Sequence, residues 1–126
     1  TVYSIVSNFT NIKDISFADK IYYDSSPAEW LQLLYNAKFI YTDSFHGVLF
    51  ALKFQKPFLA YYSEALRATR FIDLAKRYNI GRFIVKDVDE IEKKGALGIE
   101  PDFIKLDCLI QEQVKKSRDF LFRSLS

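Results

Sequence analysis

Short apolar runs alternate with longer segments of helical periodicity along most of the chain. Runs rich in β-branched and aromatic residues occur at residues 2–6, 20–23, 39–41, 58–62 and 82–85, and each run predicts a strand. Apolar residues spaced three and four apart predict helices over residues 27–37, 45–54, 71–78, 88–94 and 101–123. This alternation predicts an α/β fold, a Rossmann-like three-layer domain with a parallel sheet.

Several of these helices have recognisable starts, stops or buried faces. Ser26 is a capping residue, Pro27 suits the first helical position and Glu29 adds a carboxylate to the first turn. Residues 45–54 are apolar all round, which predicts a buried helix, and Gly95 is the expected stop for residues 88–94. The last helix is expected to bury Leu106, Ile110, Val114 and Leu121.

Composition narrows the class of protein. The 126 residues, 49% of them hydrophobic, suit one domain with a real core, and the net charge of +2 is not gathered in a basic block that would indicate nucleic acid binding. The single cysteine, Cys108, excludes an intramolecular disulfide and favours a cytoplasmic setting. The chain starts without Met and contains none, so we expect residues 1–126 to be one domain of a longer protein.

Polar residues follow the predicted strands, where ligands bind in open parallel sheets. The main cluster is Thr42, Asp43 and Ser44, followed by His46 and Gly47. Free N–H groups at the start of the next helix favour an anion there. Two further polar positions are Ser26, after the second strand, and the pair Arg67 and Arg70, three residues apart on the next helix.

Each candidate also has a purely structural interpretation. His46 is the only histidine, in the first turn of a helix beside a glycine that lets a ligand approach, which suits proton transfer; it can equally be a hydrogen-bonded core residue. Asp43 can cap the helix, orient His46 or act on substrate. Arg67 and Arg70 suit a carboxylate or phosphate, although such a pair is often a solvated face. No residue spacing indicates a metal site.

The segment Thr42-Asp43-Ser44-Phe45-His46-Gly47, with Lys56-Pro57-Phe58 after it, resembles the polysaccharide pyruvyl transferase family. Matching residues at 26–31, 37–40 and 70–74 extend the resemblance over roughly residues 1–85. One position departs from it, because many members have Arg where this chain has Ser44.

The resemblance implies transfer of a pyruvyl group from phosphoenolpyruvate to a sugar of a cell-surface polysaccharide, with no cofactor. It also implies a fold like the carboxyl-terminal half of a GT-B enzyme, with the missing amino-terminal half as a partner. His46 would be the general acid/base, with Asp43 beside it, and Arg67 or Arg70 would hold the donor, helped by Thr42, Ser44, Gly47 and Ser26.

Two other functions stay open at the level of sequence. A nucleotide-sugar glycosyltransferase would use the same loops of the same half-domain, and a non-catalytic binding domain would keep the fold without turnover. The expected acceptor is a sugar or lipid-linked saccharide. A lipid-linked acceptor would be compatible with peripheral contact of the protein with the inner face of the membrane. The sequence does not specify which sugar accepts the group, its linkage or the oligomeric state, and we expect the 126 residues alone to be inactive.

Overall fold

The computed structural model describes residues 2–5, 18–22, 25–62 and 65–125, with the backbone alone for residues 65–67. It divides into two compact units, residues 1–37 and residues 38–126. Each unit is described separately, and the prediction of a single domain stays a prediction.

The described residues of the first unit form two parallel strands and one helix. Strands β1 (Tyr3–Ile5) and β2 (Lys20–Tyr22) pair in register, with Tyr3 opposite Lys20. Helix α1 (Pro27–Asn36) begins as the sequence predicts, because Oγ of Ser26 accepts a hydrogen bond from the amide of Glu29 at 3.2 Å.

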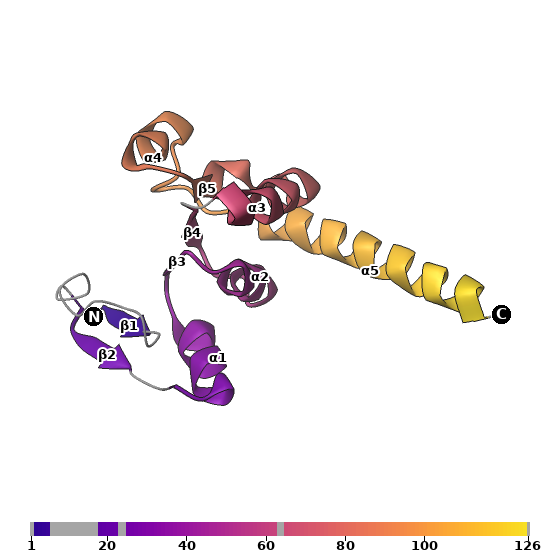
Figure 1. The fold of residues 1–126 in the computed structure, drawn as a ribbon, viewed down its shortest axis with the longest axis horizontal. Helices are drawn as coiled ribbons and strands as arrows, with labels where there is room; N and C mark the ends of the chain where they lie inside the picture. Colours follow the sequence, from indigo (N-terminus) through magenta and orange to yellow (C-terminus); the bar gives the residue numbers. More distant parts are fainter. Residues whose placement is uncertain (1, 6–17, 23–24, 63–64, 126) are drawn as a thin grey trace. The chain divides into compact units, whose positions relative to one another are not determined.

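The second unit is built on a parallel sheet with the order β3-β4-β5 (Figure 1). Its strands are β3 (Ile40–Thr42), β4 (Phe58–Tyr61) and β5 (Ile84–Val85), with Ile40 opposite Phe58. Together with the helices below, these parallel strands confirm the predicted Rossmann-like α/β class. The run at residues 82–85 is a strand only at its end, because Gly81–Phe83 form a 3-10 turn, η2, closed by a bond from the Phe83 amide to the Ile80 carbonyl.

Helices α2 (Phe45–Lys53) and α3 (Ala65–Tyr78) follow β3 and β4. The core includes side chains at most 1% exposed from both helices and the sheet: Val48, Ala51, Phe58, Ala60 and Phe71. The prediction that α2 is buried all round is wrong in part. It buries the stripe of Gly47, Val48, Ala51 and Leu52, whereas Phe45, Leu49, Phe50 and Phe54 are half-buried.

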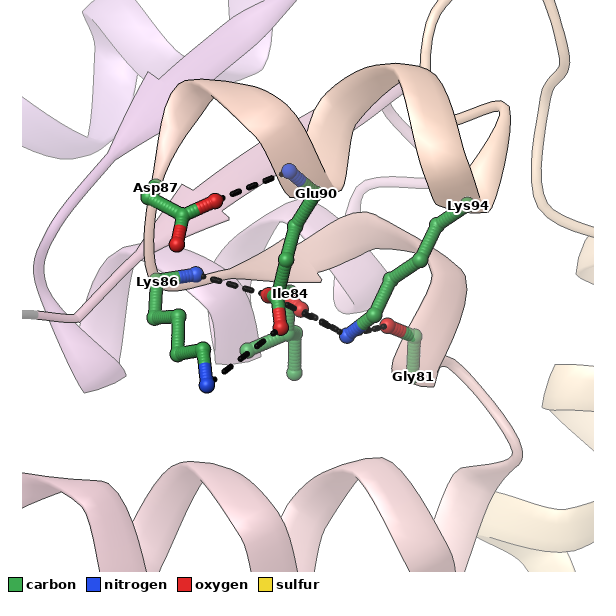
Figure 2. A network of polar contacts seen from close by, with 6 residues as sticks. All are labelled: Gly81, Ile84, Lys86, Asp87, Glu90 and Lys94. Atoms are coloured by element: carbon green, nitrogen blue, oxygen red, sulfur yellow. Dashed lines mark hydrogen bonds and ion pairs between the residues drawn. The ribbon is translucent and has the colours of Figure 1, made fainter.

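Helix α4 (Val88–Lys94) is tied to the strand before it by polar contacts (Figure 2). Nζ of Lys94 donates to the carbonyl oxygens of Gly81, at 3.3 Å, and Ile84, at 3.0 Å. Glu90 accepts from the Lys86 amide at 3.0 Å and pairs with Lys94 at 3.5 Å. Asp87 caps the helix, and Gly95 ends it in the left-handed region at φ 60°, as predicted.

The last helix, α5 (Phe103–Leu125), is less buried than its periodicity suggests. Leu106 is buried and Ile110 half-buried, but Val114 is 44% and Leu121 58% exposed, so the prediction is wrong for these two residues. Periodicity identifies a helix, whereas burial depends on what packs against it, and the described core reaches only the first turns of α5. None of the described helices is long and apolar enough to span a membrane.

Candidate functional site

A hollow of about 270 Å³ opens in the second unit beside the amino terminus of α2. It is formed by the turn between β3 and α2 and by the middle of α3. Its lining combines one carboxylate, one imidazole, one guanidinium, one hydroxyl and two aromatic rings: Asp43, His46, Arg70, Ser44, Phe45 and Phe71. Four of these six, Asp43, Ser44, His46 and Arg70, are residues that the sequence singled out.

The turn is shaped by its own hydrogen bonds. Oγ1 of Thr42 accepts from the Ser44 amide at 3.0 Å, and Oγ of Ser44 accepts from the Gly47 amide at 3.3 Å. Ser44 is therefore the capping residue of α2, and neither Thr42 nor Asp43 fills that position. Thr42 and Ser44 thus have structural roles here, and Ser44 also lines the hollow.

Gly47 is buried, and the neighbour over it is Thr42. A Cβ atom at this position would overlap the Thr42 hydroxyl and lie 3.1 Å from its Cβ and Cγ2 atoms. The glycine therefore allows the first turn of α2 to pack closely against the end of β3. A role for Gly47 in the approach of a ligand to the backbone stays a prediction.

His46 is exposed at the rim of the hollow, in the first turn of α2. Its ring meets the Phe45 ring edge to face, with centroids 6.0 Å apart and planes at 85°. Exposure excludes the interpretation of His46 as a core residue and leaves the imidazole accessible to a ligand. No hydrogen bond joins it to Asp43 within the described residues, so Asp43 does not orient it here.

Asp43 is also exposed and lines the hollow directly after β3. Its charge reaches the neighbouring strand position, Tyr41: burial, then the nearby Tyr61 and then Asp43 raise the pKa of the Tyr41 hydroxyl above its ordinary 10.0. The carboxylate is thus a local source of negative potential at one side of the hollow.

Arg70 supplies the positive charge of the hollow from α3. Its Cζ atom lies over the Phe45 ring, 4.4 Å from the centroid, which is a cation–π contact. The side chain of Arg67 lies outside the described residues, so the proposed pairing of the two arginines stays a prediction. Ser26 belongs to the first unit, where it caps α1.

The sequence did not identify the aromatic lining. Phe45 and Phe71 are the first apolar residues of the helices predicted over residues 45–54 and 71–78, and Phe71 is 1% exposed. Their rings meet edge to face at 6.1 Å, which joins the start of α2 to α3. The available signal was the position of each phenylalanine directly beside a candidate polar residue, His46 or Arg70.

A family model described as polysaccharide pyruvyl transferase matches residues 2–64, half of the 126 residues, including the whole of the turn from Thr42 to Gly47. Comparisons with curated proteins and with solved structures gave no match. The matched segment runs through β3, α2 and β4 and contains most of the hollow's lining. The chain belongs to the polysaccharide pyruvyl transferase family.

Proposed function

We propose that this chain contributes the hollow beside α2 to a transferase that moves the pyruvyl group of phosphoenolpyruvate onto a sugar of a cell-surface polysaccharide or its lipid-linked precursor. The observation that carries the proposal is the convergence of His46, Asp43 and Arg70 in one hollow. An anionic donor needs a cation, which Arg70 provides, and proton transfer needs an accessible acid or base, which His46 provides. His46 and Asp43 lie in the segment that the family model matches.

Each residue then has a defined role. The guanidinium of Arg70 binds the carboxylate or phosphate of the donor, together with the free N–H groups at the start of α2. His46 delivers a proton to the methylene carbon of the donor, which makes the adjacent carbon electrophilic. Asp43 accepts a hydrogen bond from the sugar hydroxyl that attacks this carbon.

The reaction balances without a cofactor. Two sugar oxygens bond to the central carbon of the donor, whose C–O bond to phosphate breaks. One hydroxyl proton ends on the methylene carbon, which becomes a methyl group, and the other leaves with inorganic phosphate. The chemistry needs one group that first gives and then regains a proton, and His46 is the candidate for it.

The test is acceptor-dependent phosphate release from phosphoenolpyruvate by the full-length protein, with a panel of lipid-linked and nucleotide-linked sugars. We expect release in wild type and a loss of at least about 100-fold in His46→Ala, the order of magnitude that general acid/base catalysis contributes. Arg70→Ala should raise the KM for the donor. Arg77→Ala is the matched control on the same helix, since Arg77 pairs with Asp73 at 3.2 Å and does not line the hollow.

Two results would contradict the proposal. One is normal release in His46→Ala at an unchanged melting temperature. The other is the absence of release with every acceptor, accompanied by thermal protection from a nucleotide sugar and none from phosphoenolpyruvate. That second result would favour a glycosyltransferase of similar architecture.

A further inference from the structure

The Phe45 ring is the common neighbour of the guanidinium and the imidazole in the hollow. The Arg70 guanidinium lies over its face at 4.4 Å, and the His46 imidazole meets it at 6.0 Å between centroids. Arg70 comes from α3 and His46 from α2, so the ring lies where the two helices approach each other.

Contacts with other aromatic rings hold the Phe45 ring in place. Phe45 is half-buried and meets the ring of Phe71 edge to face at 6.1 Å. Phe71 is 1% exposed and stacks in turn on Tyr62, with centroids 5.8 Å apart and planes at 17°. The contacts run from the core to Phe45, so the ring is a fixed surface under a long and flexible arginine side chain.

We infer that Phe45 is a positioning residue for the anion site: its ring holds the Arg70 guanidinium at a fixed place relative to His46, so that a bound carboxylate or phosphate lies within reach of the imidazole. The inference deepens the proposed function and rests on it for the identity of the anion. Phe45 itself takes no part in proton transfer.

A ring face is needed for this role, because a cation is attracted by the negative face of an aromatic quadrupole and not by apolar bulk. Phe45→Leu keeps an apolar side chain and loses the attraction. Phe45→Tyr keeps the face. A trifluorinated phenylalanine at position 45 keeps the shape of the ring and weakens its negative face, so it serves if Phe45→Leu does not fold.

The experiment measures the affinity of the full-length protein for phosphoenolpyruvate by calorimetry, alongside phosphate release. We expect Phe45→Leu and the trifluorinated variant to bind about three- to tenfold more weakly, the order of one cation–π contact. Phe45→Tyr should bind phosphoenolpyruvate with the same affinity as wild type. The effect should appear mainly in KM, with a smaller change in kcat.

A double-mutant cycle separates positioning from general structural support. If Phe45 acts through Arg70, the loss caused by Phe45→Leu largely disappears in the Arg70→Ala background. Losses that multiply instead, or unchanged affinity in the trifluorinated variant, overturn the inference. If the binding measurements show the expected coupling between Phe45 and Arg70 but no turnover is detected, only the proposed reaction is refuted. Absence of phosphoenolpyruvate binding in wild type would overturn the inference as well.

Discussion

A methyl group at Gly47 tests whether this glycine is required by packing. In Gly47→Ala the new Cβ meets the Thr42 hydroxyl and lies 3.1 Å from two carbon atoms of the same side chain. Forcing an extra carbon into a packed site costs about 1–3 kcal/mol, while alanine in place of glycine in a helix recovers roughly 0.5–1 kcal/mol. The overlap with the Thr42 hydroxyl puts the packing cost in the upper part of its range, about 2–3 kcal/mol, so the expected net loss of unfolding free energy is about 1–2.5 kcal/mol.

Urea denaturation followed by circular dichroism measures this loss. With a slope of about 2 kcal/mol per molar urea, the midpoint should fall by roughly 0.5–1.2 M. Gly81→Ala is the matched control, because its new Cβ would have no neighbour closer than Ala75 Cβ at 4.0 Å; we expect no destabilisation there. Gly47→Ala with wild-type stability would refute the packing argument.

The same contact predicts coupling between Gly47 and Thr42. Thr42→Ala alone removes the acceptor of the Ser44 amide and should cost about 1 kcal/mol. Because it also removes the Thr42 hydroxyl and Cγ2, two of the three atoms nearest the new methyl group, the double variant should lose less stability than the two single losses added together. Strict additivity would show that Gly47→Ala destabilises the protein by another route.

Three further predictions concern Glu90, Tyr41 and Gly95. The hydrogen bond from the Lys86 amide, followed by the Lys94 charge, lowers the pKa of Glu90 below its ordinary 4.5 despite partial burial. The ionised Glu90 therefore stabilises the folded protein fully above pH 4.5, and this contribution is lost as the pH falls through the lower pKa of the folded state. Thermal melts of Glu90→Gln should accordingly depend less on acid pH than those of wild type. Asp43→Asn should move the raised pKa of Tyr41 towards 10.0, because the negative charge of Asp43 is one of the causes that raise it. An NMR titration of the tyrosine ring carbons, with Tyr41→Phe used for assignment, measures this pKa. The same pKa in Asp43→Asn and wild type would show that the two groups do not interact. Gly95→Ala should cost about 1–2 kcal/mol in urea denaturation, because the backbone at φ 60° is left-handed. In the described part of the chain, apart from the adjacent residues, nothing comes within 4 Å of the added Cβ atom, so a steric clash does not contribute. An unchanged midpoint would contradict this prediction.

Local chemistry was predictable from the sequence, and contacts between distant segments were not. Ser26 and Gly95 were assigned correctly because a helix cap depends on residues within one turn. The exposure of Val114 could not be predicted, since its helical period does not specify what packs against it.

The candidate site shows the same division. The turn from Thr42 to Gly47 was identified from consecutive residues, but the contact of Arg70 with Phe45 joins positions 25 apart and depends on how α3 packs beside α2. The exposure of His46 likewise needed the structure, because a first-turn residue can face the core or the solvent. Sequence therefore identified the candidate chemistry, and the structure supplied its surroundings.

Ser44 connects the stability of this turn with its affinity for an anion, because it caps α2 and lines the hollow. Ser44→Arg introduces the residue that the resemblance to the family leads us to expect at this position. Loss of the cap on the Gly47 amide should lower the unfolding free energy by about 1 kcal/mol. The added guanidinium should tighten phosphoenolpyruvate binding, since a second cation would face the donor beside Arg70. Ser44→Ala is the control: it should lose the same stability without gaining affinity. Equal affinity in both variants would show that position 44 does not contact the anion, and the serine in this chain would then be explained by capping alone.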